Sequence, residues 1–215
     1  MDGTTNQTNV HGLNRRAMLG LTLGLGAALA TPSRVLAEAS GLTGYERRLV
    51  TIAMRERDRM GAMLARPDVV AIADFARPSH ETRLHFVDMV GGTVRSHLVA
   101  HGRGSDPEHI GWLKQFSNHV GSYATSRGAY LTVGQYEGKY GPSMRLRGLD
   151  LDNSNAYDRA IVMHPAWYAA PDMVAKYGKL GRSEGCFAMA PEDFSLALTY
   201  LGGGRLLYAD RIGEG

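Results

Sequence analysis

Seven short apolar runs, separated by turn residues, constrain the fold of this chain more than any other feature. Each is five to eight residues long, which suits strands better than helices, and Gly91, Gly92 and Gly102 lie between them. The pattern predicts a mostly β domain, with strands at 69–75, 84–90, 94–101, 129–133, 144–149, 160–164 and 205–209.

Two further segments have helical periodicity. Residues 45–64 repeat apolar side chains at helical spacing and predict an N-terminal helix that packs on the sheet. Residues 191–201 begin with Pro191, which suits the first helical position, and Glu192 and Asp193 suit the first turn. We therefore expect a second helix that ends at Gly202.

The N-terminus resembles a secretion signal. Arg15 and Arg16 precede 13 uncharged residues, 18–30, and small-residue cleavage sites follow at 35–37 and 37–39. The apolar run is shorter than the ~20 residues that span a bilayer, so a removed signal is favoured over a permanent membrane anchor. We expect twin-arginine export to the periplasm after removal of residues 1–39; an uncleaved interfacial helix is the alternative.

The charge of the mature chain argues against nucleic acid as a partner. Without residues 1–39, 176 residues remain, with 21 basic and 19 acidic side chains. The charged run at 55–59 alternates in sign along a predicted helix, which is typical of a solvated face.

Cys186 is the only cysteine in the sequence. In an exported protein a single cysteine has no partner for an intramolecular disulfide. It is therefore a buried spectator, half of an intermolecular disulfide, or a reactive thiol.

The neighbouring segments favour a reactive thiol. Residues 160–163 form an apolar strand-like run that ends at His164 and is stopped by Pro165. Cys186 follows His164 by 22 residues and lies in a glycine-containing turn before the predicted helix. An imidazole can take the thiol proton and hold the resulting charge, whereas the alternative for His164 is a structural histidine at a strand end. Gly185 would let a substrate carbonyl approach the Cys186 N–H, as an oxyanion site requires.

At these residues the chain resembles a known family. His164 followed by 183-SEGC-186 is similar to the His, then Ser-x-Gly-Cys pattern of the YkuD-type L,D-transpeptidases. Five ordered blocks are similar to the murein L,D-transpeptidase catalytic domain branch: 98-LVAHGRGSD-106, 116-FSNHVGSYATSRGAYLT-132, 138-GKYGPSMRLRGLD-150, 155-NAYDRAIVMHPAWY-168 and 179-KLGRSEGCFAM-189.

The resemblance implies a fold, a domain division and site roles. The expected fold is a β-sandwich with a few short helices and an N-terminal helix, divided into a signal peptide (1–39), a helical segment (40–66) and a catalytic domain (67–215). Cys186 would be the acylated nucleophile and His164 its base, with Gly185 and Ser183 shaping the turn. Many relatives have His or Arg where this chain has Glu184, whose charge disfavours a thiolate, and Gly where it has Pro165, which lacks an N–H.

The implied substrates are donor and acceptor stem peptides of peptidoglycan, with carbapenems as implied inhibitors. Because stem peptides carry carboxylates, guanidinium groups are suitable cleft residues. Candidates for lining the cleft, each with a structural role as the alternative, are His101, Ser117, Asn118, Tyr123, Tyr140, Arg145 and Arg182.

No metal or cofactor is implied. His97 and His101 would share one face of a strand but lie ~13 Å apart, too far for a common zinc ion. His101 would instead line the cleft or be an ordinary strand-end histidine.

The sequence thus predicts a cysteine acyltransferase that builds or remodels the cell wall and contributes to cell shape, by cross-linking stem peptides or by exchanging a D-amino acid. Whether the cross-links are 3-3 or 1-3 stays open. One alternative is an L,D-carboxypeptidase or a cysteine amidase; papain-like and NlpC-type enzymes, however, place the cysteine before the histidine. Another is a non-catalytic wall-binding domain.

Overall fold

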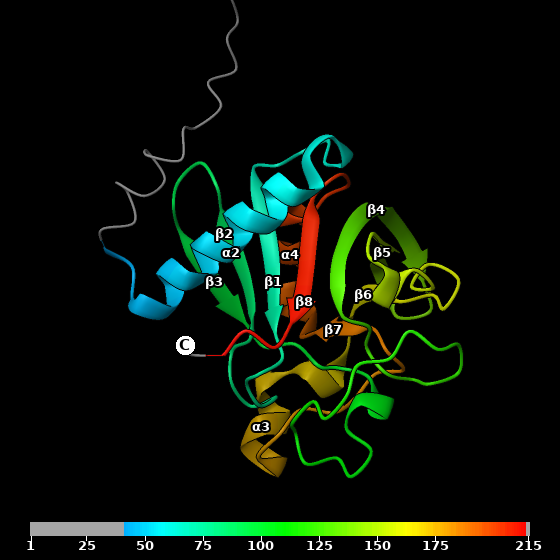
Figure 1. Cartoon of the computed structure of the whole chain (residues 1–215). Helices are drawn as coiled ribbons and strands as arrows, with labels where there is room; N and C mark the ends of the chain where they lie inside the picture. Colours follow the sequence, from blue (N-terminus) through cyan, green and yellow to red (C-terminus); the bar gives the residue numbers. More distant parts are fainter. Residues whose placement is uncertain (1–40, 214–215) are drawn as a thin grey trace, which may run out of the picture.

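A computed structural model describes residues 41–213, and the predicted signal segment therefore lies outside the described residues. The described part has eight strands and three α-helices joined by loops and 3-10 turns (Figure 1). The strands are β1 (Val69–Asp74), β2 (Leu84–Asp88), β3 (Val94–His97), β4 (Gly128–Gly138), β5 (Gly141–Gly148), β6 (Val162–Pro165), β7 (Phe187–Met189) and β8 (Leu206–Asp210), and the helices are α2 (Gly44–Met60), α3 (Pro171–Tyr177) and α4 (Pro191–Tyr200).

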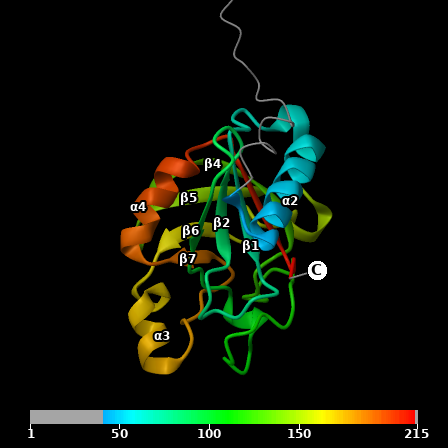
Figure 2. The same ribbon diagram turned by 90° about the vertical axis from the view of Figure 1, so that its left-hand side faces the viewer.

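All eight strands belong to one hydrogen-bonded sheet, in the order β3-β2-β1-β8-β4-β5-β6-β7. The β1–β8 and β6–β7 pairs are parallel, and the other pairs are antiparallel. The sheet has two halves, β3-β2-β1-β8 and β5-β6-β7, and the long strand β4 belongs to both. The register between β4 and β5 shifts between Thr132 and Gly134. A bulge increases local bend and twist. The β5–β6–β7 part accordingly crosses behind β1 and β2 (Figure 2).

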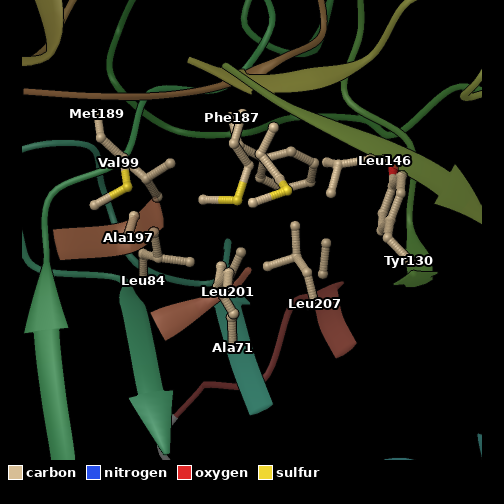
Figure 3. Packing of buried hydrophobic residues seen from close by; sticks show 14 of the residues in the cluster. Ala71, Leu84, Val99, Tyr130, Leu146, Phe187, Met189, Ala197, Leu201 and Leu207 are labelled. Carbon is tan, nitrogen blue, oxygen red and sulfur yellow. The ribbon is translucent and has the colours of Figure 1, made fainter. Parts of the chain in front are cut away.

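The main core lies between the two halves of the sheet. Ala71, Leu84 and Leu207 come from one half, and Leu146 and Phe187 come from the other (Figure 3). Helix α4 adds Phe194 and Ala197 to the same cluster, and Leu201, which caps the helix, adds a third side chain. Side chains from two facing parts of the sheet share one core, so the predicted β-sandwich is confirmed.

Helix α2 covers the opposite face of the β1 half. It begins with a capping box in which Thr43 and Glu46 bond each other's backbone N–H groups. Its buried face packs with Val70 and Leu206 in a second apolar cluster. Tyr45 donates a 2.6 Å hydrogen bond to Asp74 Oδ2 and so fixes the start of the helix to β1. Figure 2 shows α2 and α4 on opposite sides of β1 and β2. The predicted N-terminal helix is therefore present.

Several predicted element bounds differ from the structure. The run 94–101 is a strand only as far as His97. The run 160–164 starts as a strand at Val162, because Ala160 has a φ of 51°. Strand β7 and helix α3 were not predicted: β7 has only three residues, and α3 has no buried residue to give it an apolar stripe.

None of the helices within residues 41–213 is long and apolar enough to cross a membrane.

Candidate active site

Two adjacent parallel strands bring the predicted nucleophile and base into one cleft. In the β6–β7 register Met163 is opposite Phe187 and His164 is opposite Ala188. Cys186 directly precedes β7, so sheet pairing sets its position relative to His164. Both residues line a cleft of about 770 Å³. Most of the 21 residues between them in sequence form the α3 excursion between the two strands.

The His164 ring is held in one orientation and one tautomer. Its Nδ1 lies 3.0 Å from the Pro165 carbonyl oxygen, which can only accept a hydrogen bond, so Nδ1 carries the proton. Nε2 is then left as the basic nitrogen. Tyr140 stacks on the ring with centroids 4.8 Å apart, and Tyr168 meets it edge-on at 6.5 Å. Pro165 therefore serves through its carbonyl, and the missing N–H is not needed for this contact.

The surroundings of Cys186 favour the neutral thiol over the thiolate. Burial raises the pKa of Cys186 and the charge of Glu184 adds to the increase, while the Val162 N–H and Arg159 act in the opposite direction. The thiol donates a 3.6 Å hydrogen bond to the Ala160 carbonyl. Burial also lowers the pKa of His164. A neutral thiol beside a neutral imidazole needs general-base activation during the reaction itself.

The turn before Cys186 requires glycine. Gly185 has a φ of 119°, a conformation that other residues rarely adopt, and a Cβ there would lie 3.0 Å from the Ala124 carbonyl oxygen. Ser183 closes the turn, because its Oγ donates to the Cys186 carbonyl at 2.6 Å and accepts from the Gly185 N–H at 3.2 Å.

A seam of close backbone contacts supports this turn. The N–H of Ser183 donates to the His101 carbonyl at 2.9 Å, and the N–H of Arg103 donates to the Ser183 carbonyl at 2.7 Å. A Cβ on Gly102 would lie 2.7 Å from Gly185 Cα, and a Cβ on Gly104 would overlap the Ser122 carbonyl oxygen. The glycines of the 101-HGRGS-105 motif thus admit the backbones of two neighbouring segments.

Glu184 points to solvent and is paired. Its carboxylate lies 3.2 Å from Arg103 Nη2, and its side chain is 70% exposed. The Arg103 guanidinium in turn lies 3.8 Å from the centre of the Tyr123 ring. Solvent and Arg103 both weaken the effect of the Glu184 charge on Cys186.

Three of the seven candidate substrate-binding residues line the cleft: Tyr123, Tyr140 and Arg182. Tyr123 adopts a φ of 52°, which is rare for a non-glycine residue and common at functional sites. Arg182 Nη1 donates to the carbonyls of Asp106 and Pro107, so this guanidinium also ties the cleft wall to a neighbouring loop.

Ser117, Asn118 and Arg145 do not line this cleft. Ser117 and Asn118 border a separate depression of about 280 Å³. Asn118 Nδ2 donates to Leu151 O and Ser154 Oγ, both at 3.0 Å, which joins two loops. Arg145 is exposed on β5, and its guanidinium lies 4.0 Å from the centre of the Tyr136 ring.

His101 is enclosed rather than cleft-lining. Its side chain is 1% exposed, its Nδ1 accepts a 2.8 Å hydrogen bond from Arg83 Nη2, and its Nε2 lies 3.5 Å from Asp106 Oδ2. Burial lowers the pKa of His101 to about 4. Because β3 ends at His97, the two histidines do not share a strand face; His97 Nδ1 contacts Asp193 at 3.2 Å. Within residues 41–213 no group of three or more potential ligands could hold a metal ion.

The cleft also contains residues that the sequence did not single out. Tyr168 and Arg159 lie within the 155–168 block, and Tyr136, Lys139 and Ser143 come from the β4–β5 hairpin. The sequence did offer one signal for Arg159. It is a charged residue next to a buried strand, five positions before His164. The hairpin residues gave none, because strand pairing brings them to the cleft.

Comparison with known proteins identifies the family. The family model described as "L,D-transpeptidase catalytic domain" matches residues 43–209. No curated protein matches the chain significantly.

Solved structures with a similar arrangement include two chains described as L,D-transpeptidases and one described only as Bd1075. One is an L,D-transpeptidase from Mycobacterium smegmatis, with 16% identity, a TM-score of 0.41, and coverage of 66% of this chain and 58% of the other. L,D-transpeptidase 3 from Mycobacterium tuberculosis, in complex with a faropenem-derived adduct, has 15% identity, a TM-score of 0.41 and coverage of 66% and 60%. Bd1075 from Bdellovibrio bacteriovorus has 13% identity, a TM-score of 0.43 and coverage of 67% and 48%.

The matched part is thus less than two thirds of the length of these structures. The family match covers most of this chain and spans both strands that carry the cleft residues. This chain belongs to the L,D-transpeptidase catalytic domain family.

Proposed function

We propose that this protein is an exported cysteine L,D-transpeptidase that cross-links or exchanges peptidoglycan stem peptides through a thioester on Cys186. One observation carries the proposal: Cys186 and His164 line the same cleft, and the Pro165 carbonyl holds His164 with Nε2 free to act as a base. Family membership supports the transpeptidase chemistry.

Acylation begins with proton transfer. As Cys186 Sγ attacks the carbonyl of an L-residue in the donor stem, its proton passes to His164 Nε2. The S–C bond forms, the backbone N–H of Cys186 receives the oxyanion, and the following D-residue leaves with the proton from imidazolium His164. The thioester therefore forms with no net change in protons.

The thioester is resolved by an amine. Neutral His164 takes a proton from the attacking amine, a new amide bond forms, and the Sγ–C bond breaks to return the thiol. Attack by a side-chain amine of a second stem produces a cross-link, and attack by a free D-amino acid produces an exchanged peptide. Attack by water hydrolyses the thioester, which is carboxypeptidase activity. A diaminopimelate stem has two L-to-D junctions, so 3-3 and 1-3 cross-links are both compatible with this mechanism.

The charges of the cleft suit a substrate that carries both carboxylates and amines. Lys139 and Arg182 are cationic groups in its lining, and Asp158 and Glu184 are anionic. The cations fit the carboxylates of a stem peptide, and the anions fit the amine of an acceptor. Tyr140 and Tyr168 flank His164 and limit the access of water to the base.

Mass spectrometry of purified muropeptides tests the proposal. Tetrapeptide and longer stems are incubated with the protein and with Cys186→Ala, with and without a free D-amino acid. We expect dimers or exchanged peptides from the parental protein alone, and fragmentation of the dimer assigns its linkage. Loss of the terminal D-residue without dimers would favour the carboxypeptidase alternative. No change with either folded protein would favour a non-catalytic wall-binding domain.

The proposal includes the twin-arginine signal and a periplasmic location, which concern residues outside the described part. Replacing Arg15 and Arg16 together by Lys should retain the chain in the cytoplasm, as fractionation and blotting would show. Unchanged export of this variant would contradict the twin-arginine route.

Carbapenem acylation of Cys186 is also part of the proposal and follows from the family resemblance. Intact-mass spectrometry should show one adduct on the parental protein and none on Cys186→Ala.

A further inference from the structure

Arg159 lies beside the turn that carries Cys186. Both residues line the same cleft, and a Cβ on Gly185 would lie only 3.4 Å from Arg159 Nη2. The residue after Arg159, Ala160, presents its carbonyl to the Cys186 thiol at 3.6 Å. Consecutive residues of one turn therefore contact both the thiol and the backbone that precedes it.

Four hydrogen bonds hold the Arg159 guanidinium in place. Nη1 donates to Ser117 O at 2.6 Å and to Ser126 Oγ at 2.7 Å, and Nη2 donates to Ser122 Oγ at 3.1 Å and to Ala124 O at 2.5 Å. All four acceptors are neutral, and no ion pair among the described residues includes Arg159. The guanidinium is therefore held in one orientation, and no carboxylate neutralises its positive charge.

The backbone of this turn is strained where it meets the thiol. Ala160 has a φ of 51°, a strained conformation for a non-glycine residue that is concentrated at functional sites. Hydrogen bonds from Arg159 N to Asn155 O, from Ala160 N to Tyr157 O and from Ile161 N to Ala156 O hold the strained conformation. The turn therefore fixes the relative positions of the Arg159 charge, the Ala160 carbonyl and the Cys186 sulfur.

The other charged groups near the thiol do not supply this charge. Among the cations that line the cleft, Arg103 is paired with Glu184, and Arg159, unlike Arg182, lowers the pKa of Cys186. Lys139 is at the tip of the β4–β5 hairpin, where its Nζ lies 5.5 Å from the Tyr140 ring centre.

The acidic and phenolic groups do not compete with it either. Glu184 opposes a thiolate, yet it is exposed and already paired. Burial raises the pKa of Tyr130 and Tyr168, which keeps both phenols neutral. Asp158 is exposed to solvent, which screens its charge.

Ala160 and Arg159 act on the thiol in opposite ways. The Ala160 carbonyl accepts the S–H bond and so stabilises the neutral thiol. After the proton has moved to His164, this hydrogen bond no longer exists, whereas the attraction between the guanidinium and the sulfur is at its strongest.

We propose that Arg159 is a positioning residue for acyl transfer: it holds the Cys186 turn against the 117–126 segment and stabilises the negative charge that develops on Cys186 Sγ. The proposal rests on the proposed function in that Cys186 is the nucleophile. It adds to the Cys186 thiol and the His164 imidazole a cation that stabilises the developing thiolate.

The test measures how fast iodoacetamide alkylates Cys186 between pH 6 and pH 11.5, because burial raises the pKa of this thiol above its ordinary value. Because the chain has one cysteine, the whole signal comes from Cys186. The parental protein is compared with Arg159→Gln, which removes the charge, and with Arg159→Lys, which keeps the charge but not the planar fork. Arg147→Gln, an exposed β5 arginine outside the cleft, is the matched control.

We expect the alkylation midpoint of Arg159→Gln to rise by ~1 pH unit, since a nearby opposite charge shifts a pKa by ~1–3 units. Arg159→Lys should stay within ~0.5 unit of the parental protein, and Arg147→Gln should not shift. The kcat for stem-peptide transfer should fall ~10-fold in Arg159→Gln near neutral pH and recover as the pH rises, with KM unchanged.

A purely structural role would lower the melting temperature of both Arg159 variants and leave their midpoints unshifted, and this result would overturn the proposal. If Arg159→Gln does not fold, Arg159→Met, a second neutral replacement, takes its place: a midpoint ~1 unit above the parental value supports charge stabilisation, and an unshifted one contradicts it. Alkylation needs no stem peptide. An unshifted midpoint with active cross-linking therefore rejects only the role of Arg159, and a shifted midpoint without cross-linking rejects only the proposed function.

Discussion

His164, near the end of β6, and His101, in the segment after β3, have nearly equal burial and different surroundings. Their side chains are 2% and 1% exposed, respectively. His164 borders a cleft of about 770 Å³ beside a thiol, whereas Arg83 and Asp106 enclose His101. Burial lowers the pKa of both, so each is neutral near neutral pH. Open volume next to a nucleophile, rather than burial or titration, separates the catalytic candidate from the structural residue.

The surroundings of His164 and those of His101 are nevertheless joined through the backbone. The His101 carbonyl accepts from the Ser183 N–H, so the enclosed cluster supports the turn that carries Cys186. His164 is the proposed proton-transfer residue, and the surroundings of His101 help to fix the position of the thiol.

The largest expected difference between the regions is in catalysis. His164→Gln should reduce the rate of stem-peptide transfer by ~10²–10⁴-fold, because it removes the general base. The melting temperature should change little, since the ring is at the edge of an open cleft. Parallel assays of His101→Leu supply the comparison. An equal loss of activity in a fully folded His101 variant would contradict the division of roles.

The close backbone contacts around Gly102, Gly104 and the Cys186 turn should be destabilised by the addition of a single methyl group. Gly104→Ala should lower the free energy of unfolding by ~1–3 kcal/mol, because the new Cβ would overlap the Ser122 carbonyl oxygen. Urea denaturation measures the change. Gly134→Ala is the control, since nothing lies within 4 Å of its Cβ position and its φ is not positive. Equal stability of the two variants would show that the seam relaxes without cost.

His101 should make the protein sensitive to acid. Its pKa is about 4 in the folded protein and 6.5 as the ordinary value, so the unfolded chain binds the additional proton first as the pH falls. The stabilisation by neutral His101 is complete above pH 6.5 and is lost progressively towards pH 4.

Replacement of His101 tests this dependence. Between pH 6.5 and pH 4, His101→Leu should make the unfolding free energy less dependent on pH. The decrease in slope should correspond to about one bound proton. Because burial also lowers the pKa of His85 to about 4, part of the slope should persist. An unaltered slope, measured by urea titrations at several pH values, would assign the acid sensitivity to other groups.

The smallest expected effect is at the departure from the family pattern. Glu184→Gln should lower the alkylation midpoint of Cys186 by less than ~0.5 pH unit, because Glu184 is exposed and paired with Arg103. Arg103→Gln, which removes the partner and leaves the acid, should shift the midpoint slightly upward. A downward shift of more than one unit in Glu184→Gln would mean that this carboxylate points towards the thiol.

The sequence predicted the regular elements where pattern and length agreed. The apolar runs that became β1, β2 and β8 and the periodic segments that became α2 and α4 were found close to their observed bounds. It missed β7, because three buried residues after a turn have no distinguishable period. It also extended the strand of His97 to His101, although the chain leaves the sheet after His97 to form the Arg83 contact.

Much of the candidate site was predicted in the same way. The thiol, the histidine and the turn glycine have local signatures, namely a single cysteine, a strand end before proline, and a glycine beside the cysteine. Ser117, Asn118 and Arg145 were chosen by residue type alone, and the structure places them away from the cleft. Arg159 and the β4–β5 hairpin reach the cleft through pairing between distant segments.

The sequence by itself determined the strand-rich architecture and the family, and it singled out Cys186 and His164 as site candidates, because periodicity and short motifs are local properties of the chain. Only the tertiary structure decided which histidine meets open volume, in which form the thiol rests, and which arginine lies beside it. These properties depend on burial, on backbone strain and on contacts across the folded sheet, as in the Arg159 bonds to residues 117–126. Such long-range contacts form only when remote segments are brought together, so no local pattern encodes them.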